Sequence, residues 1–512
     1  MEYKKFDLKL LPNEYWWGGA IEDGVSMPYG SGDFTGDLRR LKGNQGAPLL
    51  LSSKGRYIWS EHPFIFRFHK GTLTIQYRYG EIQYGEGFGS LPSAYQYAAK
   101  TFFPFSGTYP DELNFLAPQY NTWIEMHYGP CQEKVLQYAQ AILDNGMPPG
   151  VLMIDDNWMN DYGSWDFYPG RFPDPREMVD TLHAMGFRVM LWVCPYVSPD
   201  SLNFRKLWAE GFLLKNKEGE PYLRRWWNGY SALIDFSNQE AVSWFQEQLD
   251  RLVDRYGIDG FKFDAGDPIL FDSEDMEPIT WHTSIYPNED CRNYALMGTR
   301  YPFNEYRESW KCGGQPLVQR LRDKEHGWGR GGLASLIPNA IAQGLMGYPY
   351  NCPDMIGGGL DGDFTSPNFK LDQELYVRYA QCAALFPIMQ FSLAPWRVLD
   401  KEHLGYCMET VRLREALGPE IVSLAKHAAK TGEPILRSME YVFPGKGYEC
   451  IKDQFMLGND ILVAPVLQKG AVKRTVVFPE GIWEGDDGKP VEGPITREID
   501  APLSRLPWFR RR

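Results

Sequence analysis

The sequence predicts an α/β protein: a (β/α)8 TIM barrel flanked by an N-terminal β-sandwich and a C-terminal β-domain. Residues 1–116 contain short alternating strands that are broken by Gly, Pro and Ser. In residues 117–430, strands that are apolar throughout alternate with amphipathic helices, as a parallel sheet covered on both faces requires. Residues 431–512 return to short strands and turns. We therefore expect three domains with these limits, the last of them a second β-sandwich.

The N-terminal part shows the alternation of apolar and polar side chains that is typical of strands. This pattern predicts strands over residues 56–59, 64–68 and 72–79. No window before about residue 110 has a helical period, so no helix is expected there. Residues 16–20, Trp-Trp-Gly-Gly-Ala, are predicted to form a turn-like loop.

The barrel part alternates strands and helices in regular order. Predicted strands cover residues 120–127, 150–156, 188–193, 258–264, 316–320 and 389–393. Predicted helices cover residues 131–143, 175–185, 238–256 and 338–346. Because a TIM barrel carries its chemistry at the C-terminal ends of its strands, we expect the active site there.

Composition and charge exclude several classes of partner. The net charge of −13 argues against nucleic acid and anionic membranes, since both attract a positive protein surface. No run of about 18 apolar residues occurs, and the N-terminus lacks the apolar core of a signal peptide. We expect a cytoplasmic protein, or one from which a signal peptide has been removed. A homo-oligomer is left open.

No metal or other cofactor is predicted. The eight Cys are scattered without a CxxC spacing, which fits buried thiols in a reducing compartment. The eight His form no HxH or HExxH motif, and no phosphate-binding glycine loop is present.

The stretch 256–267 combines a short strand with acidic residues at its end. Lys262 and Asp264 lie two residues apart, so their side chains leave the same face of the strand. A lysine there would keep Asp264 ionised, which a carboxylate nucleophile requires. A structural Lys–Asp pair in a polar barrel mouth is the other interpretation.

Carboxylates recur at the predicted strand ends. Taken singly, each could be a turn or cap residue, but together they indicate acid/base or nucleophilic chemistry. Glycoside hydrolysis is the reaction class built on two carboxyl groups. The residues concerned are Asp155, Asp156, Asp264, Asp267, Asp323 and Asp354, interleaved with Trp158, Trp165, Trp192, Trp226, Trp227, Trp328 and Trp396.

Several motifs in fixed order resemble glycoside hydrolase family 31, the retaining α-glycosidases, over nearly the whole chain. Within it the chain is most similar to the α-galactosidase-like subgroup that contains the myogenesis-regulating glycosidase. The motifs begin with Trp17-Gly-Gly19, and the tail from Phe455 to Trp483 looks like the family's C-terminal β-domain. The barrel motifs are Lys262-Phe-Asp-Ala-Gly266, Asp323-Lys-Glu-His-Gly-Trp328, Pro353-Asp-Met-Ile-Gly-Gly358, Met389-Gln-Phe-Ser392 and Pro395-Trp-Arg397.

The resemblance implies a double-displacement reaction. Asp264 matches the nucleophile and Asp323 the acid/base residue, whose proton Trp328 should help to retain by desolvation. Retention implies a separation of about 5–5.5 Å between the two carboxyl groups. Arg322 should point away from Asp323, and Arg320 should contact Asp264 or a sugar hydroxyl. The residues expected to bind substrate are Asp155, Asp156, Trp192, Lys262, Arg320, Asp354, Trp396 and Arg397; for Trp192, packing in the barrel core is the other interpretation.

Two departures from the family pattern bear on the sugar. The α-glucosidase pattern Asp-Ile-Asp is replaced by Asp155-Asp156-Asn, as in the α-galactosidase-like subgroup, and Pro353 replaces a His. Two carboxylates turned inward could hold the 4- and 6-hydroxyls of galactose. The expected partner is thus a small-molecule glycoside or oligosaccharide, most simply an α-galactoside.

Other functions stay open at this point. α-Glucosides, α-xylosides and sulfoquinovosides are the alternatives within the family, and the last would need an anion site supplied by Arg224, Arg225 or Arg397. A non-catalytic carbohydrate-binding member is the alternative from another class. The same residues would also serve transglycosylation.

Overall fold

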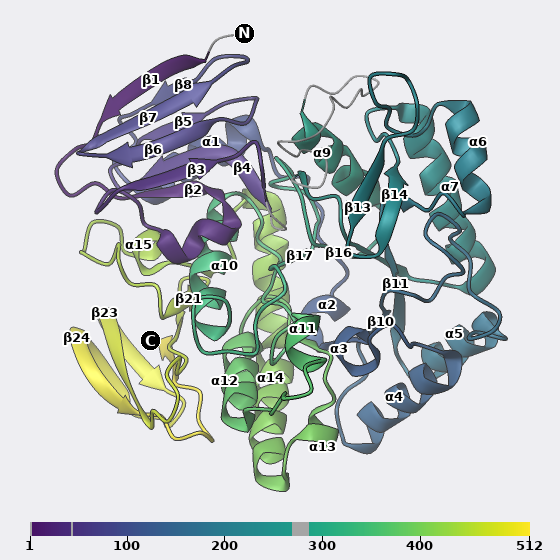
Figure 1. Ribbon diagram of the computed structural model, residues 1–512. Helices are drawn as coiled ribbons and strands as arrows, with labels where there is room; N and C mark the ends of the chain where they lie inside the picture. Colours follow the sequence, from purple (N-terminus) through teal and green to yellow (C-terminus); the bar gives the residue numbers. More distant parts are fainter. Residues whose placement is uncertain (1–2, 42–44, 269–285) are drawn as a thin grey trace. The chain divides into compact units, whose positions relative to one another are not determined.

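A computed structural model describes residues 3–41, 45–268 and 286–512 (Figure 1). It contains two compact units, and each is described by itself. The first comprises residues 1–38, 46–118 and 313–512, and the second residues 39–45 and 119–312. The domain limits expected from the sequence stay predictions.

The first unit begins with two four-stranded antiparallel sheets whose facing sides form an aromatic core. Trp16 of one sheet approaches Phe68 of the other, with ring centroids 6.4 Å apart. This is the expected β-sandwich. The first sheet runs β1 (Lys4–Lys9), β7 (Thr72–Tyr77), β6 (Ile65–His69) and β3 (Phe34–Asp37), and the second β2 (Trp16–Ala20), β4 (Gly46–Ser52), β5 (Tyr57–Trp59) and β8 (Gln83–Gly85).

Two sequence predictions in this part are wrong. Residues 16–20 form strand β2 instead of a loop, although Gly18 and Gly19 have positive φ and a bulge interrupts the pairing with β4. Helix α1 (Leu91–Phe102) occupies a stretch where no helix was expected. Ser90 caps α1 by accepting a hydrogen bond from the Ser93 N–H.

The rest of the first unit consists of a bundle of helices and a second β region. Helix α14 packs against α2, α12 and α13, and α10 packs against the 3-10 turn η1 (Ile21–Ser26). The other bounds are α2 (Leu113–Leu116), η3 (Leu333–Ser335), α10 (Leu336–Leu345), α11 (Asp361–Phe364), α12 (Gln373–Ala384), α13 (Pro395–Val398), α14 (Lys401–Thr431) and α15 (Met439–Val442).

Six strands near the C-terminus form one antiparallel sheet. Met456, Phe478, Trp483 and Phe509 are among the side chains that fill its core. The sheet order is β20 (Leu436–Arg437), β21 (Phe455–Leu457), β22 (Ile461–Val463), β25 (Trp508–Arg511), β23 (Lys473–Gly485) and β24 (Pro490–Asp500).

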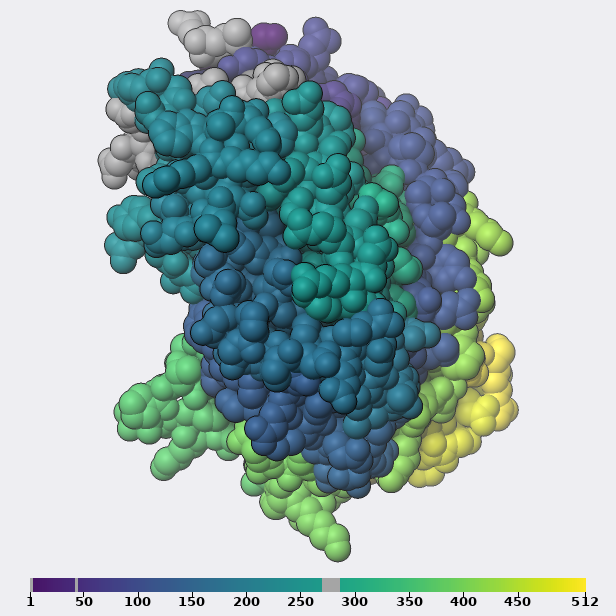
Figure 2. All heavy atoms as spheres, turned by 90° about the vertical axis from the view of Figure 1, so that its right-hand side faces the viewer, coloured from purple at the N-terminus to yellow at the C-terminus, as the bar shows by residue number. Residues whose placement is uncertain are grey.

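The second unit holds parallel strands in register, each followed by helix or loop. Helix α5 packs against β11, α4 and α7, and Figure 2 shows surface atoms of this unit in blue to teal. The strands are β9 (Gln119–Asn121), β10 (Val151–Ile154), β11 (Arg188–Val193), β15 (Gly260–Phe263) and β16 (Phe303–Tyr306). The helices are α3 (Trp123–Met126), α4 (Gln132–Asp144), α5 (Pro175–Ala184), α6 (Leu202–Glu210), α7 (Gln239–Tyr256), α9 (Pro287–Met297) and η2 (Gly298–Arg300).

The barrel strands confirm the expected (β/α)8 architecture. The first unit contributes β17 (Gln319–Arg320), β18 (Asn351–Cys352) and β19 (Gln390–Phe391), and the second contributes β9, β10, β11, β15 and β16. The strand expected over 120–127 is shorter than predicted, because the Asn121 side chain accepts a hydrogen bond from the Trp123 N–H and starts α3.

A small antiparallel sheet is inserted after β11. Its strands run in the order β12 (Tyr196–Val197), β14 (Gly229–Leu233) and β13 (Leu223–Trp226), and β13 and β14 form a hairpin. Among the residues that the structure describes, no helix is both long and apolar enough to span a bilayer.

Candidate active site

Asp264 follows directly after β15, at the C-terminal strand end where the sequence predicts chemistry. Its Oδ2 accepts a hydrogen bond of 2.7 Å from the Trp192 indole, and its Oδ1 accepts one of 2.9 Å from the Ala265 N–H. The guanidinium of Arg307 lies 3.7 Å from Oδ1. Donors and a cation beside a carboxylate favour its ionised form, the form in which a carboxylate attacks.

Lys262 forms a buried ion pair with the first of the two acidic residues after β10. Its Nζ lies 2.6 Å from Asp155 Oδ2, and both side chains are only 3% exposed. The structure also places the Arg307 guanidinium beside Asp264. The effect of Lys262 on Asp264 that the sequence suggests stays a prediction.

Asp155 and Asp156 are both buried at the end of β10, so the turn after the strand brings both inward. The Asp156 N–H donates to Asp155 Oδ1 at 2.8 Å. Asp156 itself accepts from Tyr162 Oη on one oxygen and from Asn228 Nδ2 on the other, at 3.0 and 2.8 Å. Burial and the neighbouring Asp155 raise the pKa of Asp156 to about 7, although the two hydrogen bonds act to lower it.

Arg307 links three groups of the second unit. Its Nε lies 3.2 Å from each oxygen of Asp267. Its guanidinium also faces the Trp227 ring at 5.3 Å from the centroid, a cation–π distance. The indole of Trp192, by contrast, is 1% exposed, so Trp192 is a buried donor to Asp264.

A second acidic group lies in the first unit. The Arg320 Nη1 lies 2.6 Å from Asp323 Oδ1 and 2.9 Å from Asp354 Oδ1, and Asp354 Oδ2 accepts from the Lys324 N–H at 2.7 Å. The contact of Arg320 with Asp264 or a sugar hydroxyl, which the sequence suggests, stays a prediction. One arginine is thus shared by the predicted acid/base residue and a buried carboxyl.

Burial dominates the electrostatics of this group. It raises the pKa of Asp354 to about 6, against the opposing effect of Arg320. Burial also lowers the pKa of Lys324 to about 8. With its amide oriented to satisfy both neighbours, Asn339 accepts a hydrogen bond of 3.1 Å from Lys324 Nζ.

The remaining predicted residues lie around the first unit's group. Arg322 points to Glu22, with which it forms an ion pair, as expected of a cation that should avoid Asp323. Trp328 donates its indole N–H to Asp372. Trp396 is half-buried and Arg397 exposed, both on α13.

Asp264 and Asp323 belong to different units, so their predicted separation stays a prediction. Three side chains that contact the predicted site carboxyls escaped sequence reasoning: Arg307, Tyr162 and Asn228. Each is a single polar residue without a motif. The available signal was Asn228 in the run Arg224–Asn228, where it stands between the aromatic pair Trp226-Trp227 and Gly229.

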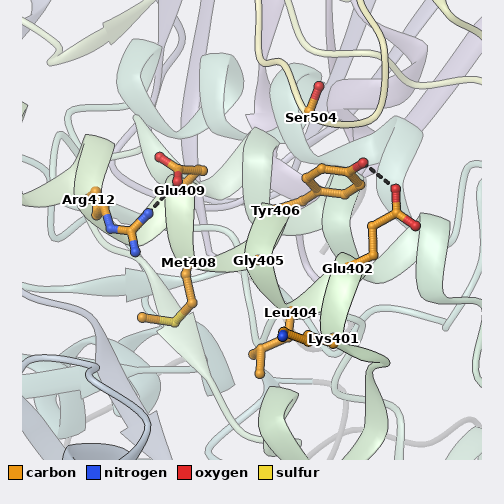
Figure 3. A pocket seen from close by; sticks show the side chains of 9 residues that line it. All are labelled: Lys401, Glu402, Leu404, Gly405, Tyr406, Met408, Glu409, Arg412 and Ser504. Atoms are coloured by element: carbon orange, nitrogen blue, oxygen red, sulfur yellow. Dashed lines mark hydrogen bonds and ion pairs between the residues drawn. The ribbon is translucent and has the colours of Figure 1, made fainter.

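A surface groove of about 840 Å³ follows the first turns of α14 and holds none of the predicted residues (Figure 3). Its polar groups bond to one another: Tyr406 donates to Glu402, and Arg412 pairs with Glu409. We therefore do not assign it a function. Within the described ranges, no cluster of three or more His, Cys, Asp or Glu could hold a metal ion.

Two known proteins are similar to this chain in sequence. A myogenesis-regulating glycosidase from Mus musculus is 35% identical over 80% of this chain and 58% of its own length. A SITS-binding protein from Tetronarce californica is 26% identical over 63% of the chain and 48% of its own length. The chain therefore spans about half the length of the curated relatives it matches.

Solved structures share the fold. A GH31 dextranase from Flavobacterium johnsoniae, complexed with glucose, superposes with a TM-score of 0.86 at 20% identity, over 100% of this chain and 66% of that one. The TIM-barrel domain of glycosyl hydrolases family 31 matches residues 119–424, more than half of the sequence, and the family's C-terminal domain matches residues 432–512. The chain belongs to glycoside hydrolase family 31.

Proposed function

We propose that this chain is a retaining α-glycosidase that hydrolyses terminal α-galactosides. Asp264 attacks the anomeric carbon and the bond to the leaving oxygen breaks, while Asp323 gives that oxygen its proton. Asp323 then takes a proton from water, whose oxygen displaces Asp264 and releases the sugar with its α configuration. Membership of the family supports the reaction class.

The observation that carries the choice of sugar is the buried pair Asp155–Asp156. Each carboxylate has its own donors, Lys262 for one and Tyr162 with Asn228 for the other. A carboxylate has about four acceptor sites, so both keep free lone pairs. Galactose carries its axial 4-hydroxyl on the same side as C6, so two adjacent acceptors suit it better than they suit glucose.

The contact with Arg320 supports the second half of the role of Asp323, because the guanidinium favours the ionised carboxyl that takes a proton from water. A general acid must hold its proton before attack begins. Because Arg320 also pairs with Asp354, the guanidinium keeps a counter-charge whether Asp323 is ionised or protonated.

The test is hydrolysis of four nitrophenyl α-glycosides (galactoside, glucoside, xyloside and sulfoquinovoside) by the parent and by Asp264→Asn. We expect turnover of the galactoside, lost in the variant. Turnover of another sugar alone would retain the mechanism and refute the use of Asp155–Asp156. Binding of galactose by both proteins without any turnover would identify a non-catalytic member.

A further inference from the structure

The tip of the β13–β14 hairpin consists of Trp227 and Asn228, between the paired residues Trp226 and Gly229. Gly229 has a φ of +100°, a backbone conformation that glycine adopts without steric cost and that closes hairpins of this kind. The two tip side chains therefore leave the end of a well-defined turn.

Asn228 reaches a buried acid of the barrel. Its Nδ2 donates to Asp156 Oδ2 at 2.8 Å, while Tyr162 donates to the other oxygen. The Tyr162 ring packs edge-on against Trp226, with centroids 4.9 Å apart. Both donors to Asp156 thus depend on the hairpin, one by belonging to it and one by packing on it.

Trp227 connects the same turn to the predicted nucleophile. Its ring faces the Arg307 guanidinium, which pairs with Asp267 and lies 3.7 Å from Asp264. The turn therefore contacts Asp156 directly through Asn228 and is connected to Asp264 through Trp227 and Arg307.

The anchoring of the hairpin does not need Asn228. Trp226 is 5% exposed, stacks on Tyr196 at 4.2 Å with an interplanar angle of 11°, and donates its indole N–H to Ser231. Because Trp226 already fixes the hairpin, the hydrogen bond from Asn228 is free to serve a purpose other than packing.

We propose that Asn228 is a positioning residue for sugar recognition, which aims the Asp156 carboxylate at the sugar and keeps it charged. This rests on the proposed function. A charged carboxylate accepts stronger hydrogen bonds from hydroxyls than a neutral acid does. Because Tyr162 and Asn228 each occupy one acceptor site, on different oxygens, Asp156 keeps an acceptor site on each oxygen for sugar hydroxyls.

The electrostatic surroundings of Asp156 make its charge near neutral pH depend on the hydrogen bond from Asn228. Burial and Asp155 raise the pKa of Asp156 to about 7, so the group titrates near neutral pH, and each donor that is lost should raise that pKa further. The titratable and charged groups that interact with Asp156 from the neighbouring elements are Asp155, Tyr162, Arg171, Cys194 and Asp264. Burial keeps Tyr162 and Cys194 neutral in this range.

The experiment compares Asn228→Ala with Ser231→Ala, which removes a hydrogen bond from the same hairpin without touching Asp156. The profile of kcat/KM against pH is measured on nitrophenyl α-galactoside from pH 5 to 9. We expect Asn228→Ala to move the acidic limb upward by about one pH unit, the worth of one hydrogen bond to a charged group. Activity at pH 7 should fall several-fold and recover toward pH 9.

Ser231→Ala should leave the midpoint of the acidic limb unchanged, and Tyr162→Phe should move it in the same direction as Asn228→Ala. A parental midpoint in Asn228→Ala, or an equal loss at every pH, would overturn the proposal.

A second readout does not depend on activity. Asn228→Ala removes a hydrogen bond to the charged form of Asp156, so it should lower the melting temperature more at pH 8.5 than at pH 5.5. Equal losses at both pH values would refute the role of Asn228. If the parent hydrolyses no sugar, the proposed function fails while this comparison still decides the inference.

Discussion

At the scale of single residues, Asp264 is surrounded by two neutral donors and a cation, each of which favours its ionised form. The Trp192 indole and the Ala265 N–H each hold one oxygen, and Arg307 lies further off. A buried indole N–H that donates to a carboxylate is a strong hydrogen bond, because the carboxylate is ionised.

Trp192→Phe removes this donor and keeps an aromatic ring in the buried site. Hydrogen bonds to charged groups contribute about 1.5–3 kcal/mol, so we expect kcat/KM to fall by about 10- to 100-fold. Steady-state kinetics with the preferred glycoside measure the loss. Trp208→Phe, an exposed tryptophan on α6, is the control and should match the parent. Parental kinetics in Trp192→Phe would show that the donor has no part in the reaction.

The raised pKa of Asp156 predicts that the stability of the protein depends on pH. Its pKa is raised to about 7 from the ordinary 3.8, so the folded protein binds this proton more tightly than the unfolded chain does. The Asp156 carboxyl therefore leaves the free energy of unfolding unchanged below about pH 4. It lowers that free energy progressively as pH rises to about 7, where the folded protein also loses the proton.

Asp156→Asn removes this penalty, so the variant should melt above the parent at pH 8.5, with the difference shrinking toward pH 5. Thermal unfolding at both values measures it. Asp180→Asn, an exposed acid on α5, should show no such pH dependence. A variant that is less stable than the parent at pH 8.5 would contradict the assignment of Asp156 as a group whose charged form destabilises the fold.

At the scale of elements, α14 is held by a buried arginine that donates to backbone carbonyls. Arg414 is fully buried and donates to the backbone carbonyls of Ala384, Phe386, Pro387 and Asn114. Burial lowers the pKa of Arg414 to about 9. The carbonyls at the end of α12 thus receive their hydrogen bonds from a side chain of α14.

Arg414→Met should destabilise the protein by about 2–5 kcal/mol, because several buried carbonyls lose their donor at once. Urea denaturation measures the difference. Arg412→Met, two residues away and exposed, is the matched control and should behave like the parent. A small effect of Arg414→Met would mean that water or other donors satisfy these carbonyls.

The elements that sequence reasoning identified are the ones with an uninterrupted period. β11 and α7 match the predicted ranges closely because apolar side chains recur in them at constant spacing. β2 was misread because Gly18 and Gly19 adopt positive φ inside a strand, where the Leu49 carbonyl leaves no room for a side chain at Gly18. The period of α1 was present in Leu91, Ala94, Tyr95 and Ala98 but lay in a stretch interpreted as β structure.

The site residues that sequence reasoning identified are those that belong to a motif or follow a predicted strand. Asp264 and the Asp155–Asp156 pair follow apolar strands, so their position at the barrel mouth could be expected. The partners of Lys262 and Arg320 could not be predicted. The alternation of side chains along a strand shows which face of the sheet a residue lies on, but not which residue it contacts. Asn228 comes from a hairpin whose approach to Asp156 is a tertiary contact that no local pattern encodes.

At the scale of the whole molecule, Arg378 joins the helical part of the first unit to its C-terminal strands. From α12 its guanidinium donates to the carbonyls of Ala471, Ala501, Pro502 and Arg505. Gln381 adds a hydrogen bond of 2.7 Å to the Leu503 carbonyl. The 471–505 segment is thus attached to α12 through Arg378 and Gln381.

Arg378→Met should release this attachment. We expect faster amide hydrogen exchange in residues 497–506 and a lower melting temperature, while exchange in β10 and β11 stays unchanged. Lys473→Met, an exposed partner of Glu498 in the same sheet, should leave the exchange rates as they are. Uniformly faster exchange along the chain would show a global loss of stability in place of a local release.

The central claim is that Asp264 forms a covalent bond to an α-galactosyl unit, and trapping of that intermediate tests it most directly. In 5-fluoro-α-galactosyl fluoride, the fluorine at C5 slows both steps, while the fluoride leaving group allows the first to proceed. We predict a fluorogalactosyl adduct on the intact protein by mass spectrometry, on the peptide that contains Asp264 and absent from Asp264→Asn. An adduct on another residue, or galactoside hydrolysis that yields the β-anomer, would contradict the account.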